Sequence, residues 1–192
     1  MNCKLKLSLI LFFVYLHGFA QNVSKDSSKL VSMAKIEFNF SGLGVNYELP
    51  IGKNLSLDNG IGFATGVQVL NDRIHYEYKI TNPVLYAKSE LKYYYNRYVR
   101  VAKKLPTSLG QGSYFAWQNK YNTQRFLDDK YKLSNTILIE AHWGIQRMLW
   151  ETLLFNTHIG IGRAFDFTTK GSSGYLALGV RISYIIPSLN KF

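Results

Sequence analysis

An alternating run from Leu55 to Val69 constrains the fold of this chain more than any other feature. Its odd-numbered positions are mostly apolar, and its even-numbered positions are small or polar: Leu55, Leu57, Ile61, Phe63, Val67 and Val69 against Ser56, Asp58, Gly60, Gly62, Ala64, Gly66 and Gln68. A period of two places successive side chains on opposite faces of a β-strand. An ordinary strand has about 5–6 residues, whereas a tilted strand needs about 9–11 to cross a bilayer. The run therefore predicts a membrane-spanning strand.

The start of the chain has the organisation of an export signal. Lys4 and Lys6 give the chain a basic start, Leu5–Leu16 is an apolar run interrupted by Lys6 and Ser8, and Gly18–Ala20 supplies small residues at the usual cleavage spacing. We expect cleavage after Ala20, which makes residues 1–20 a signal peptide. The alternative is an uncleaved membrane anchor, but the run is shorter than the roughly 20 residues that a spanning helix needs.

The composition fits a membrane protein better than a nucleic-acid-binding protein. The chain has 23 Lys and Arg against 12 Asp and Glu, and a formal net charge of +11. Because export makes nucleic acid an unexpected partner, we expect the surplus charge to face phosphate-bearing lipid, including lipopolysaccharide, or to lie in solvated loops. Abundant Tyr (14) and Phe (12) fit the aromatic girdles of membrane barrels. The only cysteine, Cys3, leaves with the signal peptide, so no disulfide is expected.

The same alternation recurs along the chain, and no segment shows a helical period. Eight strands are predicted: Ala34–Leu49, Leu55–Val69, Arg73–Ile80, Val84–Asn96, Ser113–Asn122, Ser134–Arg147, Leu153–Phe167 and Tyr175–Ile186. An even strand number is typical of bacterial single-chain barrels and puts both chain ends in the periplasm. We therefore predict an all-β protein: a flexible lead-in over residues 21–33, then an antiparallel up-and-down transmembrane β-barrel over residues 34–192.

Two of the predicted strands are irregular. Within Ala34–Leu49 the apolar parity changes at Ser41–Gly42, which predicts a β-bulge. Arg73–Ile80 is the weakest strand, and it can instead be a hairpin arm that projects above the membrane. In that case the eighth strand lies hidden within Asn22–Phe40.

The polar face of the strands distinguishes a membrane barrel from a soluble one, which points its apolar face inward. Here that face carries small residues and charges of both signs. An eight-stranded barrel is just wide enough inside for side chains, so enclosed charges must pair. We predict an interior polar network without an open pore, made of Glu48, Asp58, Lys88, Glu90, Lys92, Lys120, Glu140, His142, His158 and Arg181. The alternative is the wet surface of a soluble sheet.

Several segments resemble small outer-membrane barrel proteins that are common in Bacteroidota. Tyr47–Leu57 looks like the first hairpin of that family, and Leu91–Asn96, His142–Arg147 and His158–Gly162 look like its other strands. The resemblance covers most of the chain after the signal peptide and carries no catalytic signature. It implies insertion by the barrel-assembly machinery, which reads an aromatic C-terminal end. That signal is either Phe192 or, because Pro187 interrupts the strand, the alternating Val180, Ile182, Tyr184 and Ile186 followed by a short tail. We expect a monomer in the outer membrane.

Three functions remain open from the sequence. The favoured one is a non-enzymatic outer-membrane barrel with a structural, adhesive or small-solute role, without cofactor or metal. The second is a lipid-modifying outer-membrane enzyme, in which Glu140, His142 and His158 form an acid–base group or a metal site. No serine is clearly placed beside either histidine, which disfavours this second function. The third is a soluble periplasmic ligand-binding barrel.

Overall fold

The structure, a computed structural model, describes residues 29–70, 73–77, 83–124 and 133–187. The predicted signal peptide and most of the lead-in lie outside the described residues, as does Phe192. The described elements are β1 (Met33–Asn39), β2 (Gly42–Pro50), β3 (Leu55–Ala64), β4 (Gly66–Leu70), β5 (Arg73–Glu77), β6 (Val84–Tyr93), α2 (Arg97–Ala102), β7 (Gly112–Asn122), β8 (Thr136–Met148), β9 (Leu153–Asp166) and β10 (Ser172–Ile185). Over these ranges, no helix has the length and apolarity needed to cross a bilayer.

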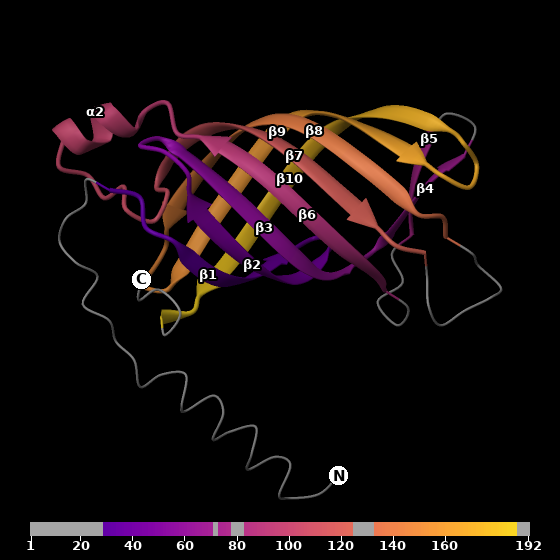
Figure 1. Ribbon diagram of the computed structural model, residues 1–192, viewed down its shortest axis with the longest axis horizontal. Coiled ribbons are helices and arrows are strands. Elements are labelled where there is room, and N and C mark those ends of the chain that lie inside the picture. The colour runs from indigo at the N-terminus through magenta and orange to yellow at the C-terminus, as the bar shows by residue number, and fades with distance from the viewer. Residues whose placement is uncertain (1–28, 71–72, 78–82, 125–132, 188–192) are drawn as a thin grey trace, which may run out of the picture.

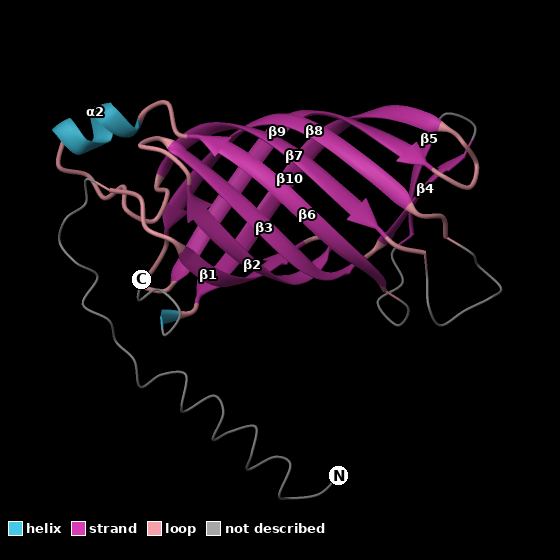
Figure 2. Ribbon diagram, in the orientation of Figure 1, coloured by secondary structure: helices cyan, strands magenta, loops and turns pink. Residues whose placement is uncertain are grey.

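Eight strands close into an antiparallel barrel in the order β1-β10-β9-β8-β7-β6-β3-β2 (Figure 1). This confirms the predicted all-β barrel and its strand number. Figure 2 shows the strand wall with α2 at one end, where β1 begins and β10 ends. The hairpin β4–β5 forms a separate two-stranded sheet at the opposite end of the barrel.

The predicted β-bulge at Ser41–Gly42 is wrong, because two strands occupy Ala34–Leu49. A turn at Phe40–Ser41 joins β1 to β2, and Asn39 pairs with Gly42 across it. The Oδ1 atom of Asn39 accepts hydrogen bonds from the backbone N and the Oγ of Ser41, at 2.9 and 2.6 Å. A two-residue turn moves the outward face from even to odd positions, as a bulge also does. The parity change was real, but its cause is a chain reversal.

The long run that begins at Leu55 leaves the barrel wall earlier than predicted. β3 ends at Ala64, and β4 pairs with β5 instead of continuing the wall. Arg73–Ile80 is therefore not a barrel strand, and the alternative holds: β1, within Asn22–Phe40, supplies the eighth strand. Residues 78–80 lie outside the described ranges.

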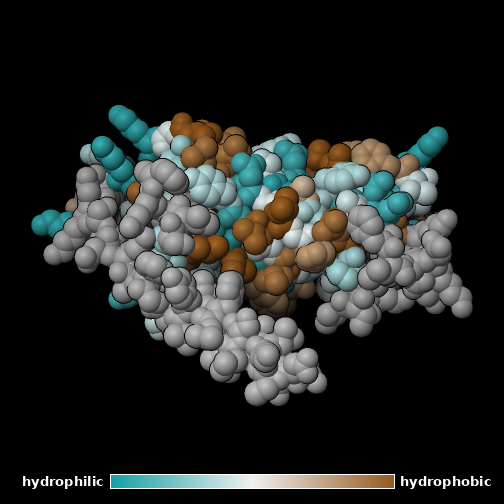
Figure 3. Space-filling model, turned by 60° about the horizontal axis from the view of Figure 1, so that its bottom comes forward, coloured by the Kyte–Doolittle hydropathy of each residue, from teal (hydrophilic) through white to brown (hydrophobic). Residues whose placement is uncertain are grey.

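The wall of the barrel is apolar outside and polar inside. On β9, Ile159 and Ile161 are exposed, whereas His158 and Asn156 are buried. Figure 3 shows brown, apolar side chains on the wall between the two ends. Small apolar clusters lie at each end of the interior: Met33, Leu109, Leu154 and Ile185 at the α2 end, and Val67, Val69, Leu138 and Ala164 at the β4–β5 end. Val67 and Val69, placed by the sequence pattern on the lipid-facing side, thus turn inward.

Candidate functional site

The interior near the α2 end holds a tight cluster of two lysines and two carboxylates. Lys35 Nζ lies 2.7 Å from both Glu48 Oε2 and Asp58 Oδ2. Lys92 Nζ lies 3.1 and 2.9 Å from the same two oxygens. Tyr94 donates a further hydrogen bond to Glu48 at 2.7 Å. All five residues are buried, so each charge is compensated by direct contacts rather than by bulk water.

Further along the interior, the ion pairs connect opposite walls. Arg181 binds Glu90 and also donates to Gln118 Oε1 at 3.0 Å. Glu90 accepts a hydrogen bond at 3.0 Å from Nε2 of His142. The Nε2 nitrogen is therefore the protonated nitrogen of the neutral His142 ring. Lys88 forms an ion pair with Glu37 of β1. These contacts fix the side chains that surround the open part of the interior.

The structure places all ten residues of the predicted network inside the barrel. Nine are buried and Lys120 is half-buried: Glu48, Asp58, Lys88, Glu90, Lys92, Glu140, His142, His158 and Arg181 form the buried set. The sequence reasoning missed Lys35 and Glu37, which pair directly with members of that set. Their signal was present, because both occupy the odd positions of Met33–Asn39, opposite the apolar Ile36 and Phe38.

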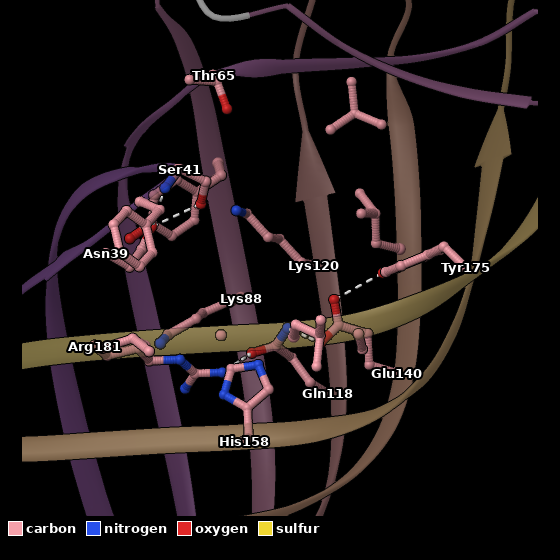
Figure 4. A pocket seen from close by; sticks show the side chains of 18 of the residues that line it. Asn39, Ser41, Thr65, Lys88, Gln118, Lys120, Glu140, His158, Tyr175 and Arg181 are labelled. Atoms are coloured by element: carbon pink, nitrogen blue, oxygen red, sulfur yellow. Dashed lines mark hydrogen bonds between the residues drawn. The ribbon is translucent and has the colours of Figure 1, made fainter.

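A cavity of about 200 Å³ remains within the β4–β5 half of the barrel (Figure 4). Glycines on the wall leave the room for two of its lining side chains. A Cβ on Gly179 would lie 2.1 Å from the His158 ring, and one on Gly162 would lie 2.4 Å from the Tyr175 ring. Each aromatic ring therefore lies directly against bare backbone, and a larger residue at either glycine would displace it.

Lys120 is the lysine of this cavity that has no carboxylate partner among the described residues. Its Nζ lies 4.5 Å from the centroid of the Tyr86 ring. The Tyr86 hydroxyl is buried and makes no hydrogen bond within the described chain. Two donors in one cavity thus lack an acceptor, which is an unfavourable arrangement unless water or a ligand fills it.

Glu140, His142 and His158 come together as the sequence indicated, with potential ligand atoms all within 4.8 Å of one another. His142 Nδ1 lies 3.7 Å from Glu140 Oε2, and both histidine Nδ1 atoms lack a hydrogen bond. The Glu90 contact on Nε2 of His142 matches the carboxylate support that metal-bound histidines often have. The nearby Arg181 and Lys120, however, oppose a further positive charge in this space.

The arrangement does not form a nucleophile and base pair among the residues described. Ser41 lines the cavity, but its hydroxyl donates to Asn39 at 2.6 Å. Glu140 accepts hydrogen bonds from Tyr175 at 2.7 Å and from Gln118 at 3.0 Å, and it therefore serves as an acceptor for neutral donors. The geometry is that of a polar cavity lined by charged, hydroxyl and amide side chains.

The fold and this cavity define a class of protein, an eight-stranded closed antiparallel β-barrel with an ionic interior. Comparison with protein-family models, curated proteins and solved structures gave no match for this chain.

Proposed function

We propose that the protein is an integral outer-membrane barrel without enzymatic activity, which holds a small ligand in its interior and does not conduct solutes. The observation that carries this proposal is the reversed polarity of the wall. Six acidic and five basic side chains of the described barrel strands face the interior, while large apolar residues face outward: Glu37, Glu48, Asp58, Glu90, Glu140, Asp166, Lys35, Lys88, Lys92, Lys120 and Arg181 are these interior charges.

The outward face supports a bilayer as the surrounding medium. Ile61 and Ile161 are 68% and 71% exposed, and Leu176 and Leu178 are 62% and 64% exposed. In water, a continuous apolar surface of this kind would promote aggregation or association. In a bilayer it faces hydrocarbon, and the closed barrel satisfies the backbone hydrogen bonds that lipid cannot. The predicted export signal and the Bacteroidota-type resemblance favour the outer membrane, with the α2 end in the periplasm.

The filling of the interior favours a binding role over diffusion through the barrel. At the α2 end, Met33, Leu109, Leu154 and Ile185 pack together across the interior. The ion-pair cluster of Lys35, Glu48, Asp58 and Lys92 follows immediately. A solute in the cavity would have to break both layers to cross. The same polarity argues against a soluble periplasmic barrel, whose apolar residues would point inward.

Single-cysteine labelling tests the proposal. Once the signal peptide with Cys3 is removed, the remaining chain has no native cysteine, so an introduced cysteine is the only thiol. Ile161→Cys in lipid vesicles should react with a lipid-soluble maleimide and resist a charged, water-soluble one. Lys53→Cys, in the exposed turn between β2 and β3, should react with the water-soluble reagent when that end is accessible. Equal water-soluble labelling at both positions, in a protein that stays soluble without detergent, would contradict membrane insertion.

A further inference from the structure

The wall of the barrel is incomplete beside β10. β1 and β10 pair over five residue pairs, which end at Asn39 and Arg181. On its other side, β10 pairs with β9 along its whole length, from Ser172 to Tyr184. The edge of β10 over residues 174–180 therefore has no hydrogen-bonded strand partner in the described part of the chain, although β5 contacts β10. β1 ends at the turn Phe40–Ser41, where the chain reverses into β2. β1 is therefore too short to pair with the rest of β10, towards Ser172.

The cavity opens through this part of the wall. Its lining includes Phe40 of the turn together with Leu176 and Leu178 of β10, whose side chains face outward. Figure 4 looks into the cavity between Asn39 and Ser41 on one side and Tyr175 on the other, with Lys88 and Lys120 inside. The opening thus joins the interior to the apolar outer surface, because Phe40 is 80% exposed and both leucines are more than half exposed.

The interior of this opening favours an anion. Three cations line the cavity, Lys88, Lys120 and Arg181, against the two carboxylates Glu37 and Glu140. Lys88 and Arg181 already have carboxylate partners, so Lys120 is the cation left to bind a ligand. The unpaired Tyr86 hydroxyl lies in the same cavity and can donate to the same ligand.

We propose that this opening is a lateral portal, through which the carboxylate or phosphate head group of an acyl-chain amphiphile enters from the surrounding membrane. The head group binds Lys120 and Tyr86, and the acyl chain stays outside against Phe40, Leu176 and Leu178. The cavity suits this division, since a water molecule takes about 30 Å³ and 200 Å³ holds a head group but no long chain. This inference rests on the proposed membrane location and names the ligand class of the same cavity.

Native mass spectrometry of the full mature chain, released from a neutral detergent, tests the portal. Three probes separate the contributions of the anionic head group and of the alkyl chain to binding. Dodecyl phosphate has both groups, inorganic phosphate has only the anionic group, and dodecanol has only the chain. We expect a one-to-one complex with dodecyl phosphate alone. Lys120→Gln should weaken it at least about tenfold, because a charged hydrogen bond is lost. Lys53→Gln removes the same charge from an exposed turn and should leave binding unchanged.

A second variant keeps the test independent of the lysine. Ala177 is buried on β10 and lines the cavity, so Ala177→Leu should fill it and weaken binding without altering any charge. Equal binding of inorganic phosphate would overturn membrane entry, and equal binding of dodecanol would overturn head-group recognition. A protein that inserts into vesicles but binds no dodecyl phosphate would refute the portal alone. Failure of insertion would instead refute the proposed function.

Discussion

Lys35 on β1 and Asp58 on β3 form a buried ion pair of 2.7 Å across the intervening strand β2. Glu48 of β2 lies between them and accepts from the same lysine. Lys92 of β6 contacts both carboxylates, so the cluster joins four neighbouring strands. Because these groups are withdrawn from water, removing one leaves its partners uncompensated.

Lys35→Met should destabilise the barrel by about 3–5 kcal/mol, the usual cost of breaking a buried ion pair from one side. Urea unfolding in lipid vesicles measures this change. Lys53→Met, in the exposed turn, is the matched control and should have little effect. Adding Glu48→Gln to Lys35→Met should recover part of the loss, since it removes one unpaired carboxylate. A double variant less stable than the single one would contradict this account of the cluster.

Ile161→Arg should cost about 2–4 kcal/mol in a bilayer if this position faces mid-membrane lipid. Trp150→Arg, in the exposed turn between β8 and β9, should cost only about 0–1 kcal/mol because interfacial positions tolerate charge. Both values come from unfolding in vesicles. In a water-soluble barrel Ile161→Arg would be nearly neutral, since surface substitutions usually change stability by less than about 0.5 kcal/mol.

Gly160→Ala should impair closure of the barrel between β8 and β9. A Cβ at this position would lie 2.2 Å from the carbonyl oxygen of Ala141 and 2.5 Å from the Cα of His142. Both are backbone atoms, so the strands themselves must separate, at about 1–3 kcal/mol for overpacking. Gly174→Ala on β10 is the control, because its nearest neighbour is 3.9 Å away. The fraction of heat-modifiable protein on a gel should fall only for Gly160→Ala, and equal fractions would count against this steric explanation.

Val69→Asp should release the β4–β5 hairpin and leave the barrel closed. Val69 is 1% exposed and packs with Val67, Leu138 and Ala164, and its N–H donates to Asp166 at 3.2 Å. A carboxylate at this site would be buried beside Asp166. Trypsin should then cut faster after Arg73, as followed by mass, while heat-modifiable migration persists. Leu70→Asp, 40% exposed, is the control. Equal cleavage of the two variants would show that the valine does not anchor the hairpin.

The later strands were predictable because each crosses the wall without interruption. The predicted strand Leu153–Phe167 corresponds to β9 (Leu153–Asp166), and Ser113–Asn122 corresponds to β7 (Gly112–Asn122). Their alternation continues for the full width of the wall, so a period of two specifies both the element and its outward face.

The first strands were harder to predict, because a change in the parity of the apolar positions does not show which structural feature causes it. A tight turn and a bulge both shift the apolar face by one position, which concealed the reversal at Phe40–Ser41. In the opposite case, the apolar residues kept the same parity on both sides of Thr65, although the chain turns inward after Ala64. Val67 and Val69 therefore kept the parity of lipid-facing residues while packing against the interior.

The candidate site was predictable as a set of polar side chains but not as a cavity. Alternation indicates that Lys120 and Arg181 share the inward face, since each opposes apolar neighbours. It does not show that Arg181 meets Glu90 from across the barrel while Lys120 has no such partner. Those differences depend on strand stagger and on which walls face each other, and both arise only on closure.

The meeting of β1 with β10 has a consequence for biosynthesis. Asn39 can pair with Arg181 of β10 only after Arg181 has been synthesised, near the end of the described chain. Because translation proceeds from the N-terminus, the edge of β1 that pairs with β10 has no partner during most of synthesis and transport. A chain of this kind is prone to aggregate until its last strand is available. A chaperone that covers the unpaired edge of β1 would therefore protect the closure of the barrel, which requires that edge to pair with β10.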